Sequence, residues 1–186
     1  MKHEAHGTQQ PRHTDKIGEA ASAAQRSDSL VQSINQRFLK LMHWELPVHI
    51  VRWQDEADKL RFIRTVVFIQ EQQVPVELEW DEFDAVGIHA LALNSEGQPI
   101  GTARLLPDGH IGRMAVLKQW RGMGVGRAIL QAILHELTQR RASKAILNAQ
   151  ISAIGFYEKF GFRPEGAVFL EANIPHIKMI LSLENI

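Results

Sequence analysis

Short stretches in which apolar and polar residues alternate recur along the chain, and this period of two predicts β-strands. The first stretch, VHIVRW, begins at Val48. Turn-forming residues at 95–98 and 107–109 separate later stretches, which favours antiparallel strands joined by tight turns. Strands are predicted over residues 48–53, 88–94, 99–106, 110–117, 144–149, 165–170 and 177–183.

Three other segments, residues 55–70, 124–140 and 153–160, have the apolar spacing of helices. In the longest, large apolar residues recur every four positions and form one face. The order of elements is β-α-β-β-β-α-β-α-β-β, in which one crossover helix makes two strands parallel. It predicts an α/β (α+β) fold with a mixed, mostly antiparallel sheet of about six to seven strands flanked by helices.

The composition divides the chain into an N-terminal extension, residues 1–45, and a domain, residues 46–186. Residues 1–29 have few large apolar side chains, so we expect a disordered tail or a helix that depends on a neighbour. Residues 30–42 carry apolar side chains with helical spacing. They predict a short amphipathic helix that packs on the domain edge or on a partner, such as the second copy of a homodimer.

The charge balance excludes some classes of function. The chain has 186 residues with 21 basic and 21 acidic side chains, whereas a general nucleic-acid binder carries a clear positive excess. The absence of cysteine excludes disulfides, thiolate metal sites and a cysteine nucleophile. The tail histidines are expected to be solvated, so no metal site is predicted. No apolar run reaches the about 20 residues of a membrane span, and the N-terminus lacks the apolar core of a signal peptide. A cytoplasmic protein is therefore expected.

A glycine-rich loop joins a predicted strand to the longest predicted helix. Gly122, Gly124 and Gly126 alternate there, which lets the backbone approach a ligand closely. Free N–H groups at the start of the helix favour an anion, and Arg121 and Arg127 add positive charge. The spacing matches neither the dinucleotide-binding fingerprint nor the P-loop. The loop therefore predicts a site for a pyrophosphate.

The spacing Arg121-x-x-Gly124-x-Gly126 resembles the Q/R-x-x-G-x-G/A signature of the GNAT N-acetyltransferase superfamily. Residues 147–162 resemble the A-x-x-F-Y-x-x-x-G-F stretch of the same superfamily. Residues 68–81 and 169–179 resemble its bacterial ElaA/YjcF-like branch. The resemblance implies the GNAT fold, in which the parallel strand pair splays, and an enzyme that takes an acetyl group from acetyl-CoA.

The same resemblance implies which residues hold acetyl-CoA. Main-chain groups of the strand before the loop would contact the pantetheine and the acetyl carbonyl, and loop N–H groups would hold the pyrophosphate. Gln150, or alternatively Asn148, would contact the pantetheine, and Phe156 would pack on the cofactor arm or in the core. The implied strand and loop residues are Met114, Ala115, Val116, Arg121, Gly122, Met123, Gly124, Val125, Gly126 and Arg127.

Acyl transfer to an amine needs a base for the amine and an acid for the departing thiolate. Tyr157, the only tyrosine in the chain, stands where the superfamily commonly places that acid. Spacing alone does not select the base. The candidates are Glu71, Glu77, Glu79, Asp81 and Glu171, of which we predict Glu71 and Glu79 as catalytic carboxylates. Substrate contacts are predicted for Glu77, Trp80, Asp81, Glu171 and His176. Trp80 could equally pack in the core, and His176 could instead be a hydrogen-bonded structural residue.

Acidic and basic residues occupy different parts of the sequence. Residues 65–103 contain seven acidic side chains and no Lys or Arg, whereas residues 109–135 contain four basic side chains and no acidic one. We expect two separate surfaces, an acidic one for a cationic amine and a basic one for the cofactor. The acceptor is expected to be a small-molecule amine. A non-catalytic CoA-binding regulatory module, a protein or peptide N-acetyltransferase, and transfer of another acyl group remain open.

Overall fold

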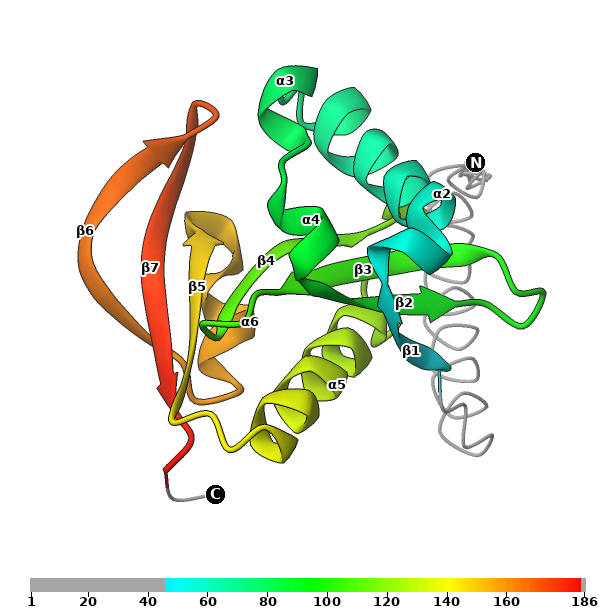
Figure 1. Ribbon diagram of the computed structural model, residues 1–186. Coiled ribbons are helices and arrows are strands. Elements are labelled where there is room, and N and C mark those ends of the chain that lie inside the picture. Colours follow the sequence, from blue (N-terminus) through cyan, green and yellow to red (C-terminus); the bar gives the residue numbers. More distant parts are fainter. Residues whose placement is uncertain (1–45, 185–186) are drawn as a thin grey trace, which may run out of the picture. The chain divides into compact units, whose positions relative to one another are not determined.

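The computed structural model describes residues 46–184, which form a sheet with helices on both of its faces (Figure 1). The N-terminal tail, the amphipathic helix at 30–42 and the dimer contact predicted from it lie outside the described residues. No helix within residues 46–184 is long and apolar enough to cross a membrane.

Seven strands form the sheet in the order β1-β2-β3-β4-β5-β7-β6. Neighbouring strands are antiparallel except β4 and β5, which confirms the predicted mixed sheet with one parallel pair. β4 and β5 are paired only at His110–Ile146 and Ile111–Leu147, so they separate beyond these residues. The strands are β1 (Val48–Arg52), β2 (Ile88–Leu93), β3 (Pro99–Leu105), β4 (His110–Val116), β5 (Lys144–Gln150), β6 (Arg163–Glu171) and β7 (Ile174–Ser182).

The helix predicted over 55–70 is an α-helix that continues as a π-helix, and two one-turn helices that follow it were not predicted. A single turn is too short to leave an apolar period in the sequence. The helical segments are α2 (Trp53–Arg64), η1 (Thr65–Glu71), α3 (Val76–Glu79), α4 (Phe83–Val86), η2 (Lys118–Trp120), α5 (Val125–Gln139), η3 (Ile151–Ala153) and α6 (Ile154–Glu158).

Two apolar clusters hold the helices to opposite faces of the sheet. Side chains of a strand alternate between faces, so Ala90 and Ala92 of β2 pack in the cluster with α5, while Leu91 packs in the cluster with α2. A Cβ atom on Gly101 would lie 2.7 Å from the Ile129 side chain, so this glycine allows α5 to lie close to β3. This packing holds the start of α5 beside the end of β4.

Candidate active site

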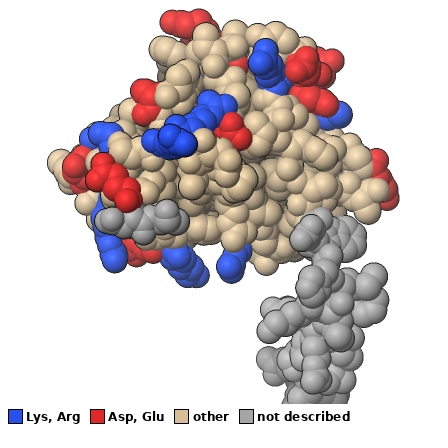
Figure 2. All heavy atoms as spheres, turned by 60° about the horizontal axis from the view of Figure 1, so that its bottom comes forward, with Lys and Arg blue, Asp and Glu red and all other residues tan. Residues whose placement is uncertain are grey.

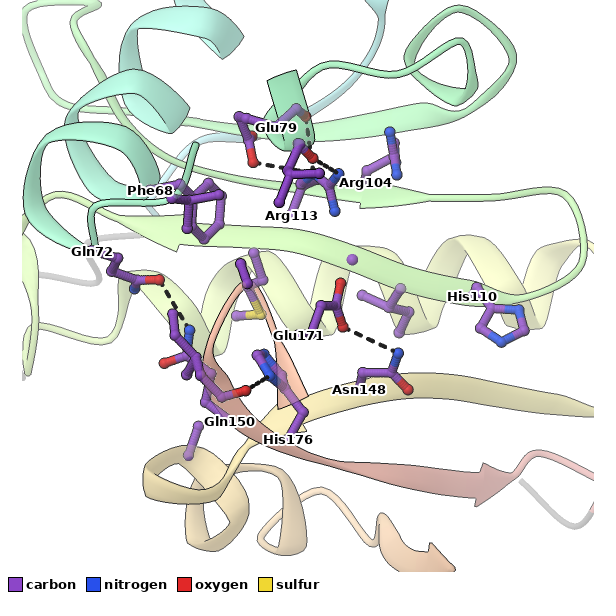
Figure 3. A pocket seen from close by; sticks show the side chains of 18 of the residues that line it. Phe68, Gln72, Glu79, Arg104, His110, Arg113, Asn148, Gln150, Glu171 and His176 are labelled. Carbon is purple, nitrogen blue, oxygen red and sulfur yellow. Dashed lines mark hydrogen bonds and ion pairs between the residues drawn. The ribbon is translucent and has the colours of Figure 1, made fainter. Parts of the chain in front are cut away.

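A cavity of about 590 Å³ lies where β4 and β5 separate (Figure 3). Its walls come from β3, β4, β5, the β6–β7 hairpin, α6 and the segment between η1 and α3. The cavity therefore collects residues from distant parts of the sequence. Those that the sequence had predicted as site residues are Glu79, Met114, Asn148, Gln150, Tyr157, Glu171 and His176.

One wall of the cavity is built by the face that β5, β6 and β7 share. Gln150 is paired with His176 across β5 and β7, and Glu171 is paired with Ile174 across β6 and β7. Because every second side chain of a strand points to the same face, Asn148 and Gln150 also lie on that face together. Asn148 Nδ2 donates to Glu171 Oε2 over 3.5 Å, so side chains of β5 and β6 meet above β7.

The opposite wall is shaped by a bulge in β4. Between Gly112 and Ala115, β4 has one more residue than the β3 segment opposite it. Arg113 lies in the bulge with φ of 50°, in the left-handed region that few non-glycine residues adopt. The bulge disturbs the usual alternation, and the adjacent side chains of Arg113 and Met114 both line the cavity.

Tyr157 of α6 brings a hydroxyl group to the cavity. Its oxygen donates to the Met114 sulfur over 3.5 Å, and a thioether is a weak acceptor. Burial raises the pKa of Tyr157 to about 12, so the hydroxyl stays protonated at neutral pH. Phe156 contacts the tyrosine ring edge-on, with 5.0 Å between ring centres. Among residues 46–184, this protonated donor is therefore engaged by a weak acceptor alone.

Six charged side chains close into an ion-pair ring in which cations and anions alternate. The ring joins α2, α3, α4, β3 and β4, and so it ties the segment after η1 to the sheet. Arg64 is fully buried and lies 2.6 Å from Asp84. In order around the ring, the residues are Arg64, Glu79, Arg113, Asp81, Arg104 and Asp84.

Burial and ion pairing act against each other on the carboxyl groups of the ring. Burial raises the pKa of Glu79, and the guanidinium groups of Arg64 and Arg113 oppose that rise. Burial also acts to raise the pKa of Asp84, but hydrogen bonds from Arg64 and Arg104 outweigh it and hold this pKa below its usual value. Glu79 lines the cavity with its carboxylate engaged by two arginines, and its role as a base stays a prediction.

Glu71, the other carboxylate predicted as catalytic, lies outside the cavity lining. Arg121 donates to its two carboxylate oxygens over 2.6 and 2.7 Å, and these hydrogen bonds lower the pKa of Glu71. The Nε of Arg121 donates to the Val116 carbonyl over 2.9 Å. Arg121, predicted to face a pyrophosphate, therefore ties the end of η1 to the end of β4.

The glycine-rich loop leads into the start of α5 without a side-chain cap. Gly122 and Gly124 have φ of 76° and 87°, and no atom lies within 4 Å of the place where a Cβ would stand. Gly124 is the N-cap of α5, no side chain caps this end, and the first turn has no acidic residue. Uncapped N–H groups and the helix dipole both favour an anion, so the loop fits the predicted pyrophosphate.

Several other predicted residues lie away from the cavity lining. Trp80 packs against Trp53 and lies beneath the guanidinium groups of Arg61 and Arg64. Phe156 lies close to Gly126, since a Cβ atom on Gly126 would lie 3.7 Å from the Phe156 ring. The remaining predicted residues outside the lining are Glu71, Glu77, Asp81, Ala115, Val116 and those from Arg121 to Arg127.

The structure adds cavity residues that no motif had indicated. Gln72 accepts a hydrogen bond from Gln150 over 3.0 Å, which links the two sides of the cavity. Phe68 lies within a block that resembles the family, but nothing in the sequence set it apart from its neighbours. Arg104 and Arg113 lie in ordinary strand patterns. The sequence therefore gives no indication that they form ion pairs with the acidic segment.

The prediction of separate acidic and basic surfaces is wrong. Glu71 of the acidic segment pairs with Arg121 of the basic segment, and Asp81 pairs with Arg113. On the face shown in Figure 2, acidic and basic side chains lie next to one another. The two segments are distant in the sequence, but the fold brings η1 and α3 against the end of β4, where opposite charges attract.

Comparison with known proteins agrees with this geometry. Residues 66–183 match the family model described as an acetyltransferase (GNAT) domain. The uncharacterized N-acetyltransferase YjcF of Bacillus subtilis is 36% identical over 135 residues, which cover 70% of this chain and 96% of that protein. A crystal structure of an acyl-CoA N-acyltransferase from Pseudomonas aeruginosa has a TM-score of 0.66 and 30% identity, over 73% of this chain and 99% of that one.

The crystal structure of Escherichia coli ElaA has a TM-score of 0.65 and 27% identity, over 72% of this chain and 97% of that one. The resemblance to the ElaA/YjcF branch is thus confirmed, together with the GNAT fold. This domain combines a bulge in β4, a parallel neighbour β5 that separates from β4, and a glycine loop that leaves the start of α5 without a side-chain cap. The chain therefore belongs to the GNAT acetyltransferase family and is an acyltransferase.

Proposed function

We propose that this protein transfers an acetyl group from acetyl-CoA to the primary amine of a small molecule by direct attack. The GNAT fold implies that the protein binds an acyl-CoA. The uncapped start of α5 suits the pyrophosphate, and a cavity of about 590 Å³ has the size of a small-molecule site. Bound acetyl-CoA supplies the thioester.

The observation that carries this proposal is the Tyr157 hydroxyl. A thiolate of ordinary basicity, with a pKa of about 8.5, leaves more readily when a donor protonates it. Tyr157 has a pKa raised to about 12, and only the Met114 sulfur accepts its proton among the described residues. It is therefore protonated and can turn toward a better acceptor. In this proposal Tyr157 is the acid.

The other residues of the site bind and orient. The main chain of Met114, Ala115 and Val116 follows the β4 bulge, and an N–H group there can stabilise the negative charge that develops on the acyl oxygen. Asn148 and Gln150, on the opposite side of the opening, can contact the pantetheine amides. The Gln150 amide, now bonded to Gln72, has donors and acceptors for this purpose.

The test is release of free thiol from acetyl-CoA with a panel of amines: aminosugars, polyamines, amino acids and aminoglycosides. We expect turnover with at least one of them. Replacing Tyr157 with Phe should lower turnover at least about tenfold, because the acid is lost, while calorimetry still detects CoA binding. Unchanged turnover in Tyr157→Phe would overturn the role of the tyrosine.

The same thiol-release assay, extended to peptides and to succinyl-CoA, separates the remaining alternatives. Tight CoA binding without thiol release on any small amine would favour a regulatory module. Thiol release with peptides alone would favour a protein or peptide N-acetyltransferase. Faster thiol release from succinyl-CoA than from acetyl-CoA would replace the acetyl group in the proposal by a larger acyl group.

A further inference from the structure

Two carboxylates line the cavity, and their surroundings differ. Glu79 is 3% exposed, and its two oxygens pair with Arg64 and Arg113. Glu171 is exposed and lines the cavity, and within residues 46–184 it accepts a hydrogen bond from the Asn148 amide at 3.5 Å. This distance is at the limit of a hydrogen bond. Glu171 therefore keeps its negative charge available to a ligand.

The β6–β7 hairpin directs Glu171 into the cavity. Ala172 and Asn173 form its two-residue turn with φ of 48° and 62°, and two positive φ values fit a tight turn between twisted strands. Glu171 and Ile174 are paired directly before and after the turn. In Figure 3, Glu171 points into the cavity from the same side as Asn148, opposite Arg113.

The charge balance of the cavity favours a cationic ligand. Arg104 and Arg113 line the cavity, but each pairs with two carboxylates of the ion-pair ring. The ring contains as many cations as anions, so it contributes no net formal charge. Glu171 adds a negative charge that the ring does not neutralise. A ligand with a positive group would restore neutrality, whereas a carboxylate would add an unpaired anion.

The histidines of the cavity are consistent with this balance. In its neutral form, His176 donates from Nδ1 to the Ile174 carbonyl over 2.8 Å, which leaves Nε2 as an acceptor. His110, at another part of the lining, has Nδ1 2.9 Å from Asp108. His176 can therefore accept an N–H group of an amine, and His110 already faces an acidic side chain.

We infer that Glu171 receives the ammonium group of the acceptor and accepts the proton that it must lose, and that the acceptor is a cationic amine without an acidic group beside the amine. This inference rests on the proposed function. Among the carboxylates that the sequence offered as the base, it selects Glu171 in place of Glu71 and Glu79. The arginines that hold those two carboxylates leave them poorly placed for it.

The proton balance of the reaction is complete with these groups. The ammonium group gives one proton to Glu171, which passes it to solvent. The amine lone pair then attacks the carbonyl carbon, the C–N bond forms, and the C–S bond breaks with its electron pair on sulfur. Tyr157 gives its proton to sulfur and regains one from the acylated nitrogen, which retains its last proton in the amide.

Replacement of Glu171 by Gln tests this role, because it removes the charge and keeps the size. We expect kcat/KM for the amine to fall at least about tenfold, with the KM for acetyl-CoA and the urea midpoint unchanged. Glu171→Asp should retain part of the activity. The control is Glu165→Gln on the same strand, where the carboxylate pairs with Lys178 outside the cavity lining and turnover should stay within about twofold.

The acceptor class is tested with an amine that carries a carboxylate and with the matching carboxamide, at equal concentrations of free amine. The wild-type protein should prefer the carboxamide, and Glu171→Gln should reduce that preference. Wild-type preference for the carboxylate, or equal turnover in Glu171→Gln and wild type, would overturn this inference and leave the proposed function standing. A wild-type protein that releases no thiol with any amine would overturn both.

Discussion

The two walls of the cavity use the same kinds of side chain in different ways. On the wall formed by β3, β4 and α3, Glu79, Arg104 and Arg113 belong to the closed ion-pair ring. On the wall formed by β5, α6 and the β6–β7 hairpin, the Tyr157 hydroxyl and the Glu171 carboxylate each make one weak hydrogen bond within residues 46–184, at 3.5 Å. The charged groups of the first wall are held by ion pairs, whereas Tyr157 and Glu171 on the second wall are held only weakly within residues 46–184.

This difference shows that a charged residue can line a cavity and still have a structural role. A buried carboxylate between two guanidinium groups has lost its hydration, and its ion pairs offset that loss. Moving the carboxylate toward a substrate would break these ion pairs. A hydroxyl group beside a thioether loses little when it turns to a better acceptor. The contacts of a group therefore indicate its role better than its position.

The largest effect on stability is expected from removal of Arg64, the fully buried member of the ion-pair ring. Arg64→Met leaves Glu79 and Asp84 without their shared cation, and it should lower the free energy of unfolding by about 3 to 5 kcal/mol. Urea denaturation measures this. Arg61→Met is the control, because Arg61 is exposed and lies over Trp53 and Trp80.

We expect the Arg61 control to cost about 1 kcal/mol or less. Equal losses in Arg61→Met and Arg64→Met would mean that the ring does not stabilise the fold. The contrast between the two walls would then rest on the second wall alone.

An intermediate effect is expected in the glycine loop, which belongs to neither wall. Gly124→Ala places a side chain at φ of 87°, which should cost about 1 to 2 kcal/mol of stability and raise the KM for acetyl-CoA. Gly97→Ala, at φ of 76° in the β2–β3 turn with equally open surroundings, should cost the same stability and leave that KM unchanged. Equal KM values in the two variants would argue against a role of the loop in binding the cofactor.

The smallest effect is a pH dependence in the ring. In the folded protein the pKa of Asp84 lies below 3.8, the ordinary value that it has in the unfolded chain. The contribution of the Asp84 carboxylate to stability is therefore present above pH 3.8 and is lost as the pH falls through the folded pKa. The stability difference between the wild type and Asp84→Asn should therefore be constant at neutral pH and shrink below pH 3.8. Urea midpoints at a series of pH values measure it, and a difference that grows in acid would contradict the ring.

The sequence predicted the strands, the long helix and the glycine loop because each leaves a local pattern. Val125, Ile129 and Ile133 recur as a buried face of α5, as their spacing indicated. The ion-pair ring could not be predicted, because its members come from six separate positions and each looks like an ordinary surface charge. The separation of acids from bases along the chain even suggested the opposite arrangement.

Site residues that belong to a sequence motif could be predicted, and those outside the motifs were predicted less well. Tyr157, Gln150 and the loop glycines follow a family pattern, and the structure brings Tyr157 and Gln150 to one cavity. The choice among carboxylates depends on pairing across the fold. Glu71, Glu79 and Glu171 have the same chemistry in the sequence. Their partners Arg121, Arg64 and Asn148 distinguish them, as do their burial and their position relative to the cavity.

The contrast between the walls is tested most directly by measuring thiol release and the urea midpoint together for Asp84→Asn and Tyr157→Phe. Asp84→Asn should lose about 2 to 3 kcal/mol of stability and keep its turnover under conditions where it is folded. Tyr157→Phe should keep its stability within about 1 kcal/mol and lose turnover at least about tenfold. The reverse pattern, with catalysis lost in Asp84→Asn and kept in Tyr157→Phe, would contradict the division of roles between the two walls.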